Sequence, residues 1–188
     1  MTTPSTRDQT IHHIYRLFAD VLEYPTHTDL AGQAKACADL LLEVSPGASA
    51  LLAVFHTFVE QAPPDRMEEL YTSTFDLQVV CYPYVGYQLF GESYKRGAFL
   101  ARLNEGYRAR DFAIGTELPD HLPVILRFLA LGGTGEFGQT LVGEGVIPAV
   151  DKMAQTFGET CTEPGQSNGD NPYSRVIRAL LLVLREEK

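Results

Sequence analysis

The sequence predicts an all-α fold, a single helical bundle, and three observations support this prediction. Apolar residues recur at intervals of three and four along most of the chain, as they do on helices with one buried face. Prolines and glycines separate these runs at the places where helices begin and end. No run alternates apolar and polar residues over the length of a strand. Residues 1–188 are therefore expected to form one domain with a single core.

Four helices are expected in the first half of the chain, with apolar stripes over residues 11–22, 30–41, 51–59 and 67–75. Pro25 ends the first helix, Asp29 begins the second, and a Ser-Pro-Gly breaker at 45–47 precedes the third. Two prolines at 63–64 open the fourth helix, because the first turn of a helix needs no backbone N–H from them.

The apolar pattern in the second half of the chain predicts further helices over residues 94–107, 117–131 and 173–184. Gly132 and Gly133 stop the second of these. Residues 136–157 are expected to form two helices that meet near Pro148, which cannot donate a helical hydrogen bond. The polar, breaker-rich segment 158–172 is expected to be a mobile loop.

Composition narrows the possible functions. Fifteen Lys and Arg oppose twenty-four Asp and Glu, and the net charge of −9 disfavours nucleic acid as a partner. No run of residues is long and apolar enough to cross a bilayer, and the first residues lack the pattern of a signal peptide. Cys37, Cys81 and Cys161 are too widely spaced for a disulfide framework or a metal pair. We expect a soluble protein of the reducing cytoplasm.

The segment "CYPYVGYQLFGESYKRG", residues 81–97, is the most unusual part of the sequence. Six aromatic residues occur between Phe75 and Tyr94, and Pro83, Gly86 and Gly91 prevent one continuous helical face. Two interpretations stay open. The aromatics can fill a core, or they can line an apolar groove whose tyrosine hydroxyls bind another chain while Lys95 and Arg96 meet an acidic group or backbone carbonyls.

Signals for catalysis, metals or cofactors are weak. His12 and His13 are adjacent, so on a helix they point about 100° apart and are not expected to bind one metal together. The glycine-rich run 131–138 lacks the Lys-Ser/Thr ending of a phosphate-binding loop. Cys81 is expected to be a small, half-buried residue. Asp120 and His121 allow two roles: Asp120 can cap the first turn of the helix expected from Glu117, or the pair can bind a ligand. We predict no metal and no cofactor.

Three blocks of the sequence resemble a known family. They are "ELYTSTFDL" at 69–77, the Tyr- and Gly-rich passage ending "GESYKRGAFL" at 91–100, and "ELPDHLPVILRFLA" at 117–130. Together they resemble the NarJ branch of the TorD-like family, the cytoplasmic assembly chaperones of molybdenum enzymes, which include the nitrate reductase delta-subunit type. The order and spacing of the blocks are also similar, so the resemblance spans most of the chain.

The resemblance implies an all-helical chaperone that is not an enzyme. Its client would be the catalytic subunit of a molybdopterin oxidoreductase, held through an N-terminal twin-arginine or vestigial signal segment until the cofactor is inserted. Some of the residues expected at the client-binding face match the family's helix that borders this face, and others match its Asp-His pair. The rest lie in the variable segment between the two. The full set is Tyr71, Phe75, Asp76, Tyr87, Phe90, Tyr94, Lys95, Arg96, Asp120 and His121.

Two departures from the nitrate-type pattern concern the choice of client. The middle passage carries Cys81 and extra breakers, and Arg127 stands where that branch often has an acid. The departures leave room for a different member of the molybdenum enzyme family as the client, although nitrate reductase remains the favoured one.

An acidic groove is the expected mechanism of binding. A client segment with paired arginines and an apolar stretch would meet the carboxylates of Asp76, Glu92, Glu117 and Asp120, and the net charge of −9 would attract it over a distance at low salt. The aromatic residues expected on the apolar side are Tyr71, Phe75, Tyr87 and Phe90.

Two other functions stay open from the residues alone. One is a small helical enzyme or nucleotide-binding protein that uses Asp120, His121 and Cys81. The other is a structural subunit that remains in a permanent complex with its partner.

Overall fold

The computed structural model describes residues 6–25, 29–76, 81–132, 134–159 and 171–186, and it confirms the all-α prediction. Within these residues there is no strand, and one isolated antiparallel bridge joins Tyr84 to His121. The helices are α1 (Thr6–Val21), α2 (Leu30–Val44), α3 (Pro46–Gln61), α4 (Pro64–Phe75), α5 (Val85–Phe90), α6 (Tyr94–Arg108), α7 (Leu122–Leu129), α8 (Gly135–Thr140), the π-helix η1 (Leu141–Val146), α9 (Ile147–Glu159) and α10 (Tyr173–Glu186).

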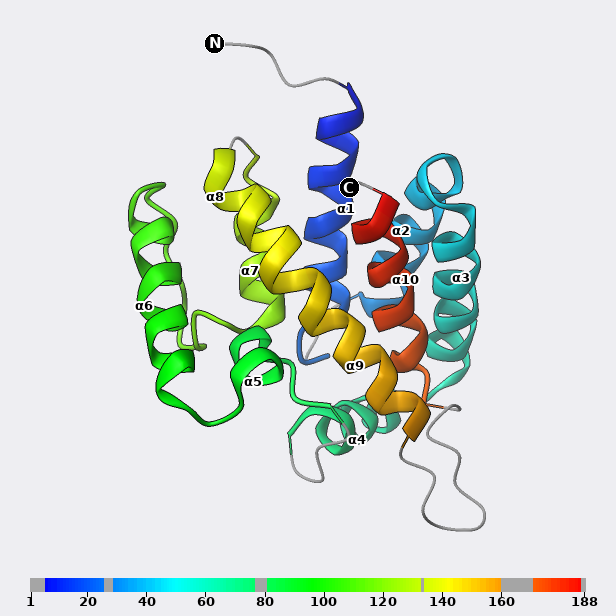
Figure 1. Cartoon of the computed structure of the whole chain (residues 1–188). Helices are drawn as coiled ribbons and strands as arrows, with labels where there is room; N and C mark the ends of the chain where they lie inside the picture. The colour runs from blue at the N-terminus through cyan, green and yellow to red at the C-terminus, as the bar shows by residue number, and fades with distance from the viewer. Residues whose placement is uncertain (1–5, 26–28, 77–80, 133, 160–170, 187–188) are drawn as a thin grey trace.

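The helices pack round one continuous apolar core. Helix α1 contacts α2 and α7, while α10 lies between α3 and α9 (Figure 1). Helix α10 buries nine of its residues, as its predicted stripe requires. Helix α6 stands at the edge of the molecule beside α5, and it buries only Leu103 and Tyr107. The first turns of α6 therefore project beyond the core.

An aromatic cluster joins α4 to α10 inside the core. The Tyr173 ring lies 5.1 Å from Phe75 and 5.9 Å from Tyr71, measured between ring centroids. Tyr71 and Phe75 themselves are 4.9 Å apart, and Tyr71 Oη donates a hydrogen bond to the carbonyl of Leu22. Tyr71 and Phe75 are only 5% and 3% exposed. This cluster fixes the end of α4 against the rest of the bundle.

Two helix boundaries differ from the prediction. The helix expected from residue 117 begins at Leu122, so Asp120 precedes it and does not cap it, and Leu118 is 45% exposed. Pro123 then occupies the first turn, where its missing N–H has no cost. The segment after Pro83, for which no helix was expected, forms the short helix α5, and Gly91 ends it with a φ of +61°, which suits glycine.

Helices α8, η1 and α9 follow one another without a break, and η1 gives way to α9 at Ile147, near Pro148, where two helices were expected to meet. Pro148 cannot donate to the carbonyl of Glu144, and its ring needs extra room there. The wider π-helical turns at Leu141–Val146 lie at this point and let the chain continue as a helix.

The predicted loop and the predicted absence of a membrane-spanning helix can be compared with the described residues only. Helix α9 extends to Glu159, into the predicted loop 158–172, and residues 160–170 of that loop lie outside the described residues. No helix in the described ranges is long and apolar enough to span a membrane.

Candidate functional site

The Asp-His pair and the aromatic segment lie side by side because their backbones are hydrogen-bonded. The amide of Val85 donates to the carbonyl of Asp120 at 2.8 Å, and the amide of Leu122 donates to the carbonyl of Pro83 at 2.8 Å. These two bonds flank the bridge between Tyr84 and His121. The start of α5 and the start of α7 are thereby fixed to each other, and their side chains form one site.

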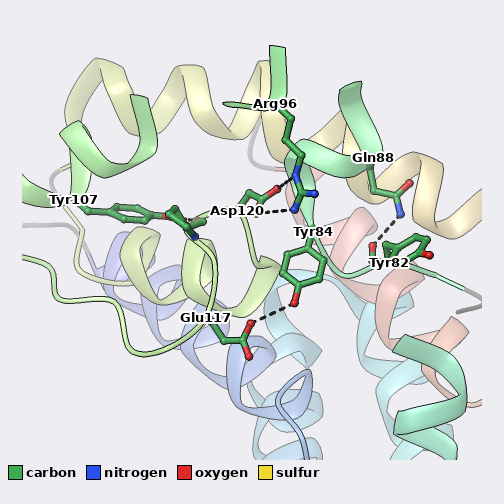
Figure 2. Close-up of polar contacts among 8 residues, drawn as sticks. Tyr82, Tyr84, Gln88, Arg96, Tyr107, Glu117 and Asp120 are labelled. Atoms are coloured by element: carbon green, nitrogen blue, oxygen red, sulfur yellow. Dashed lines mark hydrogen bonds and ion pairs between the residues drawn. The ribbon is translucent and has the colours of Figure 1, made fainter. Parts of the chain in front are cut away.

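Asp120 and Arg96 form an ion pair at the centre of this site. Arg96 Nε donates to Asp120 Oδ2 at 2.9 Å, and Nη2 donates to Oδ1 at 3.3 Å, which is a two-pronged contact (Figure 2). The Asp120 side chain is fully buried, whereas the Arg96 side chain is 19% exposed. A buried carboxylate is stable only with such a partner, so Arg96 and Asp120 depend on each other. The acidic group that Arg96 meets is thus the chain's own Asp120.

Two tyrosine rings flank the guanidinium group of Arg96. Its central carbon lies 5.5 Å from the ring centroid of Tyr84 and 5.7 Å from that of Tyr87, within the range of a cation–π contact. Tyr84 Oη in turn donates to Glu117 Oε2 at 3.3 Å. Burial, followed by the charge of Glu117, raises the pKa of Tyr84 to about 12, so its hydroxyl remains a donor. Asp120, Tyr84 and Tyr87 together form a guanidinium site, which Arg96 fills.

The close approach of Asp120 explains the glycine at position 86. A Cβ atom there would lie 2.7 Å from Asp120 Oδ2, 3.0 Å from Phe99 Cδ1 and 3.2 Å from Arg96 Cγ. Any side chain at this position would have to push the carboxylate, the ring or the arginine stem aside. Gly86 therefore lets α5 approach the ion pair directly.

Gly86→Ala is expected to lower the free energy of unfolding by about 1–3 kcal/mol, because its methyl group would overpack the space beside Asp120. Urea unfolding followed by circular dichroism measures the change. Gly97→Ala is the matched control: it lies within α6 with no atom within 4 Å of the new Cβ, and should stabilise by roughly 0.5–1 kcal/mol. Equal stability of Gly86→Ala and the wild type would contradict this packing.

His121, the residue after Asp120, is only 4% exposed. Its ring centroid is 5.2 Å from that of Tyr84, and its buried Nδ1 has no hydrogen-bond partner. Burial, the largest influence, lowers the pKa of His121, and the positive charge of Arg127 acts in the same direction, while Glu117, Glu23 and Asp120 oppose it. His121 is therefore a neutral packing residue near neutral pH.

His121 should make the stability fall at acid pH. Its pKa is lower in the folded state than the value of about 6.5 in the unfolded chain, so below that pH the unfolded chain binds more protons. The free energy of unfolding of the wild type should then decrease between pH 7 and pH 5 by up to about 1.4 kcal/mol per pH unit on account of this group.

Urea unfolding at several pH values tests this expectation. In His121→Asn the decrease should be shallower, whereas His13→Asn, at an exposed position of α1, should keep the slope of the wild type. The same pH slope in His121→Asn and the wild type would contradict a buried, neutral His121.

The predicted binding residues differ widely in exposure. Tyr71 and Phe75 lie in the core and offer no surface to a ligand in this conformation, because α10 covers them. Phe90 is 37% exposed, Tyr94 is 95% exposed, and Lys95 beside it is exposed as well. The remaining predicted residues are Asp76, which is exposed, Tyr87 and Arg96, which are half-buried, and Asp120 and His121, which are buried.

The exposed aromatics continue from the guanidinium site over α5 to the start of α6. Tyr82 is 40% exposed, and its ring packs on that of Tyr87 with 4.3 Å between centroids and a tilt of 51°. Gln88 Nε2 donates to the Tyr82 carbonyl at 2.9 Å, which holds the segment against α5 (Figure 2). We call Tyr82, Tyr84, Tyr87, Phe90 and Tyr94 the aromatic face.

The Cys81 thiol is not activated as a nucleophile. The Cys81 thiol is buried, and burial raises its pKa to about 12, so it is protonated near neutral pH. Its sulfur contacts the Tyr82 carbonyl and Gln88 Nε2, each at 4.0 Å. Across the described ranges, no group of three or more His, Cys, Asp or Glu residues could hold a metal ion.

Sequence reasoning missed Tyr84 and Phe99 as members of the site. Phe99 lies one helical turn after Arg96 on α6, and this spacing was the available signal. No local signal reveals Tyr84, because its place depends on the pairing of residues 83–85 with residues 120–122.

Comparisons with known proteins agree with this fold. Residues 42–146, more than half of the chain, match the model of the family described as nitrate reductase delta subunit. A crystal structure from Archaeoglobus fulgidus, of a protein to which redox enzyme maturation is ascribed, superposes with a TM-score of 0.57 at 20% sequence identity. The match covers 96% of this chain and 94% of that chain, and at this identity it supports the fold alone. No curated protein matches the sequence.

Proposed function

The chain belongs to the nitrate reductase delta subunit family, whose members are chaperones and not enzymes, and we propose that it holds the catalytic subunit of a molybdopterin oxidoreductase during maturation. It binds this client in the cytoplasm through an arginine-bearing N-terminal segment and releases it after cofactor insertion. The proposed client is a nitrate reductase or a related molybdenum enzyme.

The observation that carries this proposal is the guanidinium site. Asp120, Tyr84 and Tyr87 surround the guanidinium of Arg96 with a bidentate carboxylate and two aromatic rings, the chemistry by which proteins bind arginine. An arginine of the client would make the same contacts. In this proposal, the client's arginine takes the place of Arg96 on Asp120.

The position of Arg96 is compatible with such an exchange. Arg96 lies in the first turn of α6, next to the exposed Tyr94 and Lys95, whereas α6 is fixed to the core by Leu103 and Tyr107, farther along the helix. Gly91, just before α6, has nothing within 4 Å of the place a Cβ would take. In the proposed exchange, Arg96 swings outward while Leu103 and Tyr107 hold α6 on the core.

The surroundings suit the rest of an arginine-bearing, partly apolar segment. Tyr82, Phe90 and Tyr94 offer exposed rings to its apolar side chains. Asp76, Glu92 and Glu117 are exposed carboxylates that can pair with a second arginine, and the net charge of −9 attracts the segment from a distance.

The test begins with capture of the client. The tagged full-length protein is purified from its own cells, and mass spectrometry identifies the bound proteins. We expect a catalytic subunit of a molybdopterin oxidoreductase, and a synthetic peptide of its N-terminal segment should bind in calorimetry more weakly as salt increases. A captured catalytic subunit that binds equally well without its N-terminal segment would contradict the proposed mode of binding.

Purification of the mature client distinguishes a transient chaperone from a permanent structural subunit. A chaperone should be absent from the purified, cofactor-loaded client, whereas a structural subunit would remain in it at one-to-one stoichiometry.

A further inference from the structure

A small apolar crevice lies beside the guanidinium site, between α5, α6, α8 and η1. Its volume is about 170 Å³, and most of its lining is apolar. The apolar side chains are Leu89, Phe90, Phe99, Leu103, Phe137 and Leu141. Arg102 and Glu144, both exposed, also line it and balance each other in charge. The crevice therefore favours an uncharged, apolar group about as large as one side chain.

Phe99 connects this crevice to the guanidinium site. One edge of its ring is beside Gly86, where Asp120 Oδ2 and Arg96 Cγ also converge. Its Cζ atom lies 3.8 Å from the place that a Cβ of Gly145 would take, on the η1 side of the crevice. The Phe90 ring, which belongs to the aromatic face, lies 5.9 Å from the Phe99 ring and lines the same crevice. The crevice is thus separated from Asp120 by the width of one aromatic ring and continues the aromatic face.

The η1 wall gives the crevice its depth. Gly145 is buried, and the nearest atom to its missing Cβ is Leu141 Cδ1 at 3.3 Å, another residue of the lining. A longer side chain at position 145 would enter the crevice. The π-helical turns of η1, which are rare and frequently occur at functional sites, carry Leu141, Glu144 and Gly145 to this wall.

We infer that this crevice binds one leucine- or phenylalanine-sized side chain of the client segment, at a fixed short spacing from the arginine that pairs with Asp120. This inference rests on the proposed function and adds to it the second recognition point. Arg96 and Phe99 are three residues apart on α6, about 4.5 Å along the helix axis. The apolar residue of the client should accordingly be three or four positions from the arginine if the segment is helical, or two positions away if it is extended.

The experiment uses a phage library of random short peptides, selected on the immobilised full-length protein. The wild type should enrich peptides with an arginine and a Leu or Phe at one fixed spacing. Gly145→Leu, which fills the crevice, should keep the preference for arginine and lose the preference for the apolar residue. Gly143→Leu is the matched control: it adds the same side chain to η1, but no atom lies within 4 Å of its Cβ, and it should select like the wild type.

Thr140→Leu on α8 fills the crevice from another wall, so the test does not depend on position 145 alone. Circular dichroism melting shows whether each variant is folded. Peptides synthesised from the selection should lose about tenfold in affinity when the apolar residue becomes alanine, in the wild type but not in the filled variants.

The outcomes separate the two proposals. Enrichment of arginine without a spaced apolar residue would overturn the crevice inference and leave the proposed function standing. The same apolar preference in both folded filling variants would also overturn it. Failure to enrich any arginine-bearing peptide would count against the proposed function itself.

Discussion

Asp120→Ala is expected to lower the free energy of unfolding by about 3–5 kcal/mol, which is the largest effect that a single polar substitution should have in this protein. The substitution removes the carboxylate that accepts two hydrogen bonds from Arg96 and leaves that guanidinium, mostly buried between Tyr84 and Tyr87, without a counter-charge. Urea unfolding monitored by circular dichroism measures the loss.

Asp76→Ala is the matched control for this prediction. It removes the same charge at the end of α4, where the carboxylate is exposed, and should change the stability by no more than about 0.5 kcal/mol. A similar, small effect of both substitutions would mean that the Arg96–Asp120 pair contributes little, and the guanidinium site would lose its structural basis.

Phe75→Ala is expected to have a comparable effect on stability, about 3–5 kcal/mol, for a different reason. Phe75 is 3% exposed, and its ring packs 4.9 Å from Tyr71 and 5.1 Å from Tyr173, so truncation would leave a cavity where α4 meets α10. Thermal and urea unfolding measure the change.

Tyr94→Ala should behave in the opposite way. Its side chain is 95% exposed, so its loss should leave stability within about 0.5 kcal/mol of the wild type while weakening the binding of the client peptide. If Phe75→Ala kept full stability and lost only client binding, the packing of Phe75 between α4 and α10 would be contradicted. Phe75 would then belong to the binding surface.

The comparison of Phe75 with Tyr94 shows why only part of the site could be predicted from the sequence. Helical periodicity located α4, α6 and α10, because one buried face leaves a regular stripe. The same stripe cannot say whether an aromatic residue lies under a neighbouring helix or faces solvent. Phe75 and Tyr94 were both expected at the binding face, and only the packing of α10 places Phe75 in the core.

The Asp-His pair illustrates the same limit for polar residues. The sequence identified Asp120 and His121 as candidates and left capping and binding open. The structure excludes capping by Asp120, since the helix begins at Leu122, and gives the carboxylate a partner twenty-four residues away, Arg96. Such a partner depends on how α5 and α7 pair through their backbones, and spacing along the chain holds no information on that pairing.

The ion pairs of Arg127 account for a basic residue at this position. Its guanidinium contacts Glu23 Oε2 at 2.6 Å and Asp20 Oδ1 at 3.2 Å, which ties α7 to the end of α1. Arg127 thus has structural partners within the chain. It does not by itself indicate a different client.

Isothermal titration calorimetry of Arg96→Gln with the client's N-terminal peptide tests the central claim most directly. If the client's arginine replaces Arg96 on Asp120, removing the internal competitor should tighten binding by about tenfold relative to the wild type. The double variant Arg96→Gln with Asp120→Asn should lose this gain, because the carboxylate is gone. Weaker binding by Arg96→Gln than by the wild type would mean that Arg96 itself contacts the client, and the exchange on Asp120 would be contradicted.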